Sequence, residues 1–291
     1  MRHPGKTPPF RGPQGEILYG SIAEVGYRRV GGLDQWTMIR GESIANPPLI
    51  LLHGGPGLSE TALFRYFNAP LEKRFTVVYW DQRGAGKSFY RNIPRSSMTV
   101  EQFIADLDEL VEYVCERLGK TKVAIFGHSW GSVLGPLYAA RFPEKVGAYV
   151  GSGQIGDWAA AEVATYAFAL AEAERLGKRR AVKKLRAIGP PPHTAQSLRT
   201  QRTLLSRQRL NLIELAPTLQ APVFFFLGRK DHWVPVENSL AYLDALAAPS
   251  KELVWFEESG HEPFMDEPTK FNTATTELVR PVLSSGASSA G

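Results

Sequence analysis

The stretch Gly127-His128-Ser129-Trp130-Gly131 constrains the fold of this chain more than any other. An apolar run at residues 123–126 precedes it, and a helix-like stretch at 132–141 follows it. A serine between two glycines at such a junction is typical of a tight strand-to-helix turn, because a side chain at either glycine position would clash. Such a turn lifts the serine hydroxyl above the edge of a sheet. The sequence therefore predicts Ser129 as a nucleophile, and the flanking segments argue against a chance match in a surface loop.

Strand-like and helix-like segments alternate along most of the chain. A first pair of strands is expected at 22–30 and 35–40, joined by a short turn. Six short apolar runs are expected to be buried strands: 49–52, 75–80, 123–126, 146–150, 223–227 and 253–256. Helical patterns occupy 99–118, with Thr99 and Gly119 as expected ends, and 132–141, 237–247 and 268–283. This alternation predicts an α/β fold with a mainly parallel eight-stranded sheet and helices on both faces.

Residues 157–217 interrupt the alternation, because they contain helix-like sequence without a convincing strand. Inserted after a strand, this segment would lie over the carboxyl ends of the strands, where open α/β sheets bind their ligands. We therefore expect a small helical cap at 157–217, inserted into a core of residues 16–156 and 218–283. A flexible arm is expected at 1–15, and a flexible tail of Ser, Ala and Gly at 284–291.

The composition is that of a globular protein, with 43% hydrophobic and 22% charged residues. A single cysteine, Cys115, rules out an internal disulfide and fits a reducing compartment. No apolar run approaches the length of a membrane span, and the N-terminus lacks the apolar core of a signal peptide. These features predict a soluble, cytoplasmic protein. The net charge of +5 comes mainly from residues 178–186, whose pattern is that of an amphipathic helix, so no nucleic-acid partner is expected.

A serine nucleophile needs a base that takes its proton and a carboxylate that orients the base. Asp231 follows the apolar run 223–227, and His261 follows the run 253–256. Both lie just past a predicted strand, and the order Ser, Asp, His along the chain is that of the α/β-hydrolases. We therefore predict Asp231 and His261 as the partners of Ser129. They are preferred over the other candidates, which are Asp244, Asp266, His3, His53, His128, His193 and His232.

Acyl transfer also needs hydrogen-bond donors for the oxyanion that develops on the substrate, each worth about 10²–10³ in rate. One donor is expected to be the backbone N–H of Trp130, directly after the nucleophile. The other is expected from the glycine loop at 53–57, most directly from Gly55, with Gly54 in contact with substrate. No group of histidines and cysteines has the spacing of metal ligands, so neither a metal nor a cofactor is expected.

Two glycine-rich stretches resemble nucleotide-binding motifs but depart from them. Residues 84–88 look like the end of a phosphate-binding loop, but that motif requires glycine where the sequence has Asp81. Residues 151–156 match G-x-G-x-x-G after a strand, but no second strand with an acidic end follows them. We therefore expect no bound nucleotide.

Three motifs stand out as a set: H-G-G-P-G at 53–57, D-Q-R-G-A-G-K-S at 81–88 and G-H-S-W-G-S at 127–132. Together they resemble the proline iminopeptidases, which are α/β-hydrolases that remove N-terminal proline from peptides. The resemblance covers about residues 20–156 and 221–283. It implies the same triad of Ser129, Asp231 and His261, and a structural loop beside the site formed by Asp81, Gln82 and Arg83. Members of the family usually have glycine where His128 stands.

The resemblance also implies that glutamates of the cap hold the ammonium group of the substrate. The predicted cap is about half as long as expected for the family, and it carries five acidic residues against eleven lysines and arginines. Glu162 is the first candidate and Glu214 the second, followed by Glu172 and Glu174.

The expected activity is release of N-terminal proline from a small peptide. The alternative is a carboxylesterase acting on small esters, in which the shortened cap has lost amine recognition. A non-catalytic binding module is disfavoured, because all the residue types that catalysis needs are present.

Overall fold

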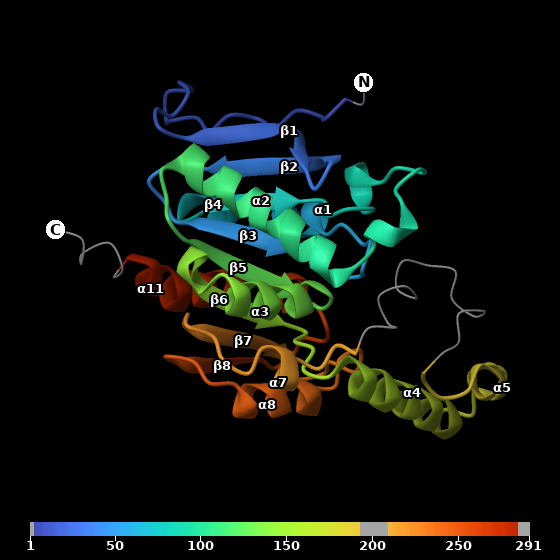
Figure 1. The fold of residues 1–291 in the computed structure, drawn as a ribbon. Coiled ribbons are helices and arrows are strands. Elements are labelled where there is room, and N and C mark those ends of the chain that lie inside the picture. The colour runs from blue at the N-terminus through green and yellow to red at the C-terminus, as the bar shows by residue number, and fades with distance from the viewer. Residues whose placement is uncertain (1–2, 193–208, 285–291) are drawn as a thin grey trace.

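The structure is a computed structural model that describes residues 3–192 and 209–284. Its strands are β1 (Ile22–Val30), β2 (Leu33–Gly41), β3 (Pro48–Leu52), β4 (Thr76–Trp80), β5 (Val123–His128), β6 (Val146–Ser152), β7 (Val223–Gly228) and β8 (Lys251–Phe256). They form one sheet in the order β1-β2-β4-β3-β5-β6-β7-β8 (Figure 1). The pairings of β2 with β1 and with β4 are antiparallel, and the others are parallel. The mainly parallel eight-stranded sheet expected from the sequence is therefore confirmed.

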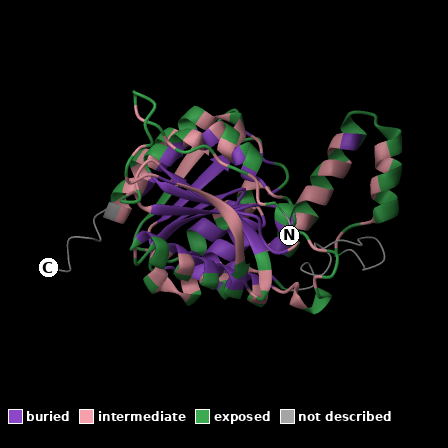
Figure 2. Cartoon of the chain, turned by 90° about the horizontal axis from the view of Figure 1, so that it is seen from above, coloured by how far each residue is buried: buried purple, intermediate pink, exposed green. Residues whose placement is uncertain are grey.

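Helices cover both faces of the sheet, and each face has its own apolar core. One face packs against α2 (Val100–Leu118), α3 (Gly131–Arg141), α7 (Leu212–Leu215) and α8 (Val236–Ala245). The other packs against α1 (Thr61–Asn68), α9 (Pro263–Asp266), α10 (Pro268–Ala274) and α11 (Arg280–Ser284). Figure 2 shows the buried strands between these partly exposed layers. This is the layered α/β arrangement that the alternating pattern predicted.

The central strand β5 shows how the sequence divides between the two cores. Val123 and Ile125 contribute to the core beneath α2 and α3, whereas Ala124 and Phe126 contribute to the opposite core. This alternation follows from the two-residue period of a strand. Because both faces are covered, residues 123–126 of the strand are all apolar, and the strand ends directly at the Ser129 turn.

The ends of α2 lie where the sequence placed them. The Thr99 side chain accepts the backbone N–H of Gln102, which caps the first turn. Gly119 has φ 61° and ends the helix in the left-handed conformation. These two predicted ends are confirmed.

Two helical regions differ from the expectation. α1 has only eight residues, and so short a segment gives little periodic signal; its Phe64 packs against Phe126 and Phe264 with ring centroids 5.3 and 5.4 Å apart. The single helix expected at 268–283 consists of α10, a π-helical segment (Thr275–Val279) and α11. Both regions bury aromatic or aliphatic side chains against the sheet.

The N-terminal residues described here run along β2. Trp36 Nε1 donates to the Pro4 carbonyl at 2.7 Å, and the Arg40 guanidinium donates to the Pro8 carbonyl at 2.7 Å. The expectation of a flexible arm did not foresee these contacts, because they depend on tertiary partners. Of the tail expected at 284–291, only Ser284 lies within the described residues.

The cap segment begins with α4 (Trp158–Arg175), which Asp157 caps, and α5 (Arg179–Ile188). The two helices pack together and project from the carboxyl ends of the strands, away from the body of the sheet (Figures 1 and 2). Residues 193–208 of the expected cap lie outside the described residues. None of the helices described, in the cap or elsewhere, has the length and apolar character needed to cross a membrane.

Candidate active site

Ser129 lies at the turn between β5 and α3, and its φ of 51° is in the left-handed region. Within the described chain it is the one non-glycine residue with a positive φ. A Cβ on Gly131 would lie 1.9 Å from the Leu52 carbonyl oxygen, and a Cβ on Gly127 would lie 2.5 Å from the carbonyl oxygen of Gly131. The approach of these backbones therefore requires both glycines. The Ser129 amide donates to the Ser152 carbonyl at 2.9 Å, which ties the turn to β6.

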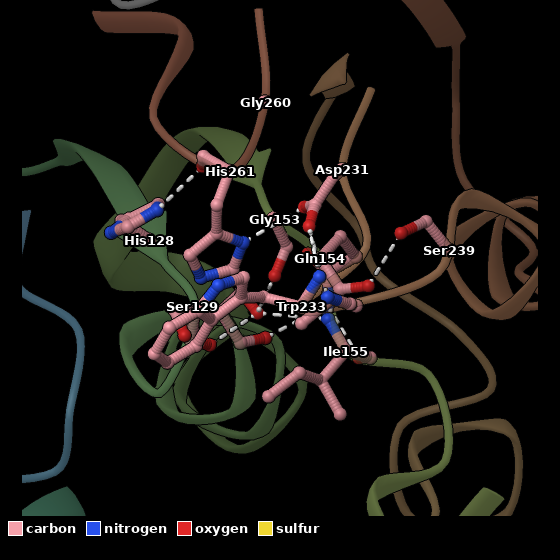
Figure 3. Close-up of polar contacts among 12 residues, drawn as sticks. His128, Ser129, Gly153, Gln154, Ile155, Asp231, Trp233, Ser239, Gly260 and His261 are labelled. Atoms are coloured by element: carbon pink, nitrogen blue, oxygen red, sulfur yellow. Dashed lines mark hydrogen bonds and ion pairs between the residues drawn. The ribbon is translucent and has the colours of Figure 1, made fainter. Parts of the chain in front are cut away.

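The structure brings Asp231 and His261 together at the same sheet edge. Asp231 lies in the loop after β7, His261 in the loop after β8, and Asp231 Oδ2 is 2.8 Å from His261 Nδ1. Asp231 Oδ1 accepts the backbone N–H groups of Trp233 and Val234, both at 2.9 Å. A carboxylate only accepts hydrogen bonds, so Nδ1 of His261 carries the proton and Nε2 carries the lone pair of the neutral ring. Figure 3 shows the imidazole between Asp231 and Ser129.

A glycine and a tryptophan define the space that the His261 ring occupies. Gly153 follows β6 with φ 51°, and a Cβ there would lie 2.6 Å from Cε1 and 2.9 Å from Nδ1 of His261. The Trp233 indole stacks with the imidazole at a centroid distance of 6.0 Å and is 73% exposed. In the sequence, Gly153 belongs to an apparent dinucleotide motif. Gly153 directly follows β6, whose carboxyl end lies at the same sheet edge as Ser129. That position in the sequence could have identified Gly153 as a residue of the site.

The glycine loop at 53–57 is held by its histidine. His53 Nε2 accepts the backbone N–H of Gln82 at 3.1 Å, and His53 Nδ1 donates to the Gly54 carbonyl at 2.9 Å. Burial lowers the pKa of His53, which favours the neutral ring that these two contacts require. The loop is therefore fixed to the residues that follow β4.

The two predicted oxyanion donors are the backbone N–H groups of Gly55 and Trp130. Within the described residues, neither N–H group donates a hydrogen bond. The N–H of Gly54, the other predicted contact residue, donates to Glu60 Oε1 at 2.9 Å. The Gly54 N–H is therefore bonded within the protein, whereas the N–H groups of Gly55 and Trp130 are available to a substrate oxygen.

The loop after β4 lies beside the site and is held by buried polar contacts. Asp81 accepts hydrogen bonds from the hydroxyls of Ser59, at 2.5 Å, and Thr61, at 3.1 Å. Arg83 forms two hydrogen bonds with Asp106, at 2.9 and 2.8 Å, and this ion pair is almost fully buried. These contacts agree with the structural role that the family resemblance implied for this loop.

A third buried histidine, His128, lies beside His261, with ring centroids 4.7 Å apart. Its Nδ1 is 2.7 Å from Glu60 Oε1, and its Nε2 is 2.9 Å from the His261 carbonyl oxygen. Both partners are acceptors, so the arrangement favours a proton on each ring nitrogen. Burial alone would lower the pKa of His128, but the charge and hydrogen bond of Glu60 outweigh it and raise the pKa to about 9. The sequence pattern did not identify this pair.

The raised pKa of His128 predicts a pH dependence of stability. The stabilisation is complete below the unfolded-state pKa of about 6.5 and is lost as the pH rises through about 9. A pKa shift of this size contributes about 3 kcal/mol to the free energy of unfolding. The free energy of unfolding of the wild type, measured by denaturant titration against that of His128→Gln, should lose this advantage between pH 6.5 and 10. Parallel pH curves for the two proteins would contradict the prediction.

The carboxylates of the cap have partners at the surface. Glu172 pairs with Arg175 at 2.6 Å, and Glu174 pairs with Arg186 at 2.8 Å. Glu214 is exposed and accepts a hydrogen bond from the Asn211 side chain at 3.1 Å.

Glu162, the first candidate for the substrate amine, lies half-buried in α4. The contacts of the other three carboxylates join them to neighbours within the cap segment rather than to the triad. A substrate-binding role for Glu162 or Glu214 therefore stays a prediction. Among the described residues, no three His, Cys, Asp or Glu side chains are grouped as metal ligands.

Comparison with known proteins agrees with this fold. The family model described as the alpha/beta hydrolase fold matches residues 47–171. The probable aminopeptidase YbaC of Bacillus subtilis (strain 168) is 30% identical over 301 positions, which cover 86% of this chain and 94% of that protein. The chain therefore belongs to the α/β-hydrolase family.

The relatives narrow the class further. The proline iminopeptidase of Neisseria gonorrhoeae is 38% identical over 125 residues, 42% of this chain and 37% of that protein. The crystal structure of a proline iminopeptidase-related protein from Thermus thermophilus has a TM-score of 0.66 at 23% identity, covering 90% of this chain and 100% of its own. The chain is thus a proline iminopeptidase-like α/β-hydrolase. The esterase RhEst1 from Rhodococcus sp. ECU1013 shares the fold, with a TM-score of 0.63 at 24% identity over 91% of this chain and 99% of its own.

Proposed function

We propose that this chain is a serine hydrolase that releases N-terminal proline from peptides, with Ser129 as nucleophile, His261 as base and Asp231 as the residue that orients the base. The observation that carries the proposal is the 2.8 Å contact of Asp231 with His261, next to a serine held at φ 51° between two indispensable glycines. A strained non-glycine residue that the surrounding fold enforces is a common feature of functional sites.

The acylation step follows from the tautomer of His261. Ser129 Oγ attacks the carbonyl carbon of the bond to be cleaved while its proton passes to the Nε2 lone pair of His261. The negative charge that develops on the carbonyl oxygen is stabilised by the N–H groups of Gly55 and Trp130. Collapse of the tetrahedral intermediate breaks the bond to the leaving group, and His261 returns the proton to the departing amine.

The deacylation step uses the same groups in reverse order. Water enters where the amine left and gives its proton to His261 Nε2 as its oxygen attacks the acyl carbonyl. The second intermediate collapses, Ser129 leaves with the proton from His261, and proline is released. Asp231 stabilises the imidazolium in both halves of the reaction, because its Oδ2 stays on Nδ1 while Oδ1 is anchored by two backbone amides.

The choice of proline as substrate rests on the relatives, whose names are aminopeptidase and proline iminopeptidase. A second candidate function is hydrolysis of small esters, and the surface pairing of Glu172, Glu174 and Glu214 favours it. An ammonium group in a partly dry pocket needs a paired carboxylate, whereas an ester has no such need.

Three substrates distinguish the two functions: proline p-nitroanilide, its N-acetyl derivative and p-nitrophenyl butyrate. An iminopeptidase should prefer free proline to the acetylated form by at least about 100-fold in kcat/KM, since losing one partner of a buried charge pair costs about 3–5 kcal/mol. The Ser129→Ala protein provides the blank for each substrate. Equal rates on the two anilides, or turnover of the ester alone, would replace the peptidase proposal by the esterase.

A further inference from the structure

We infer that Glu60 and His128 form a positioning pair that fixes the glycine loop and the backbone of His261 relative to each other. The inference rests on the proposed function, since it assigns to the pair the task of aligning the predicted oxyanion loop with the predicted base. Neither residue contacts the reacting atoms, so both act through the groups that they hold.

The pair closes a continuous chain of hydrogen bonds that runs from the loop after β3, through the last residue of β5, to the loop after β8. The Gly54 amide donates to Glu60 Oε1 at 2.9 Å, the same oxygen lies 2.7 Å from His128 Nδ1, and His128 Nε2 donates to the His261 carbonyl at 2.9 Å. Figure 3 shows the last of these contacts, with the His128 ring pointing at the backbone of His261. One end of the chain is therefore the glycine loop, and the other is the residue that carries the base.

The pair also lies directly beside the nucleophile. A Cβ built on Gly54 would lie 2.6 Å from Glu60 Oε1, 3.1 Å from His128 Nδ1 and 3.3 Å from Ser129 Cβ. A larger residue at position 54 would therefore have to displace the Glu60 or His128 side chain. The crowding also means that a displacement of either side chain would be passed on to the loop beside Ser129.

Burial makes the pair depend on both members. The side chains of His128 and Glu60 are 2% and 7% exposed, and Phe264 packs against the His128 ring at a centroid distance of 5.1 Å. Removing one partner of a buried ion pair leaves an uncompensated charge in a low-dielectric site. The other ionisable groups that act on His128 are Glu262, which favours its charge, and His53, with which its ring interacts electrostatically.

Glu60 also prevents the His128 imidazolium from repelling the positive charge that forms on His261. His261 must accept a positive charge during the reaction, and a lone cation 4.7 Å away would oppose that charge. Glu60 neutralises the His128 imidazolium, so the intact pair places no net charge beside His261. Glu60 left alone would favour the positive charge that His261 must accept, whereas burial drives His128 left alone toward its neutral form, which gives no such help.

The test compares Glu60→Gln, His128→Gln and the double variant with a matched control, Glu72→Gln. Glu72 is an equally buried carboxylate, paired with Arg40 at 2.8 Å, and its contacts with Arg40 and Tyr79 lie away from the glycine loop. Both single variants should lower kcat by about 10–100-fold with little change in KM, as expected when a catalytic group is slightly misplaced. The double variant should be no worse than the poorer single one. Glu72→Gln should lose thermal stability and keep its kcat.

A pH profile of kcat/KM separates positioning from general damage. In His128→Gln the unpaired Glu60 carboxylate should move the acid limb of the kcat/KM profile to higher pH, whereas in Glu60→Gln that limb should stay in place or move to lower pH. A merely structural loss would move both variants the same way. Unchanged kcat in both single variants, or shifts of the same sign, would overturn the inference.

One further measurement is independent of turnover. Hydrogen exchange of the Gly54 amide, followed by NMR, should accelerate in both single variants and remain slow in Glu72→Gln, because Glu60 is its acceptor. Slow exchange in all variants would show that the pair does not hold the loop. If instead Ser129→Ala kept its activity while Gly54 exchange responded as expected, the proposed function would fail and the structural part of the inference would stand.

Discussion

Ser129→Ala is expected to abolish hydrolysis of every substrate, with kcat lower by about 10⁶-fold, as is usual when a catalytic serine is removed. Within the described residues the Ser129 hydroxyl makes no hydrogen bond, so its loss removes the proposed nucleophile without breaking a structural contact. The turn itself depends on Gly127 and Gly131, which remain. The variant should therefore fold and bind substrate but form no acyl-enzyme.

Stopped assays with the anilide and ester substrates, together with covalent labelling by a fluorophosphonate, check this result. Ser43→Ala provides a matched control, because the Ser43 hydroxyl bonds locally, accepting the Ala45 amide at 3.2 Å. That control should react as the wild type does. Turnover of Ser129→Ala within tenfold of wild type would refute the assignment of the nucleophile.

Asp231→Asn is expected to lower kcat by up to about 10⁴-fold while leaving the fold intact. The reason is geometric. Oδ1 of Asp231 accepts two backbone amides, so the asparagine must keep its oxygen there and turn its NH₂ group toward His261 Nδ1. That donor makes Nδ1 an acceptor and moves the ring proton to Nε2, where the base needs its lone pair.

The measurement is kcat at several pH values, with thermal unfolding to verify the fold. Asp244→Asn is the control, since Asp244 is an exposed carboxylate in α8. It should leave kcat unchanged. A harmless Asp231→Asn would mean that another carboxylate orients His261.

Much of the arrangement could be predicted from the sequence, because it follows from where strands end. Asp231 and His261 lie 30 positions apart, yet each follows a parallel strand, and such strands bring their carboxyl ends to one edge. The glycines at 127 and 131 likewise indicate a tight turn. The structure shows the close backbone approach that requires them. Local patterns sufficed wherever topology alone decides which residues meet.

The pair of Glu60 and His128 could not be predicted in this way. These residues are 68 positions apart, and their contact depends on how the segment before α1 folds back over the Ser129 turn. No periodic pattern encodes that path. The cap shows the same limit, because Glu172 and Glu174 are held by arginines of the cap helices rather than by a substrate pocket.

The attachment of α4 has a consequence for how this enzyme family diversifies. Thr165 Oγ1 donates to the Trp233 carbonyl at 2.9 Å, and the Phe168 ring stacks on His232 at 4.0 Å, so the cap is fastened to the turn that also supplies the amide anchoring Asp231. The position of the cap and the position of Asp231 therefore depend on the same turn. A cap transplanted from a relative would therefore need the matching 232–233 turn as well. Without that turn, the Asp231 carboxylate would lose its alignment with His261.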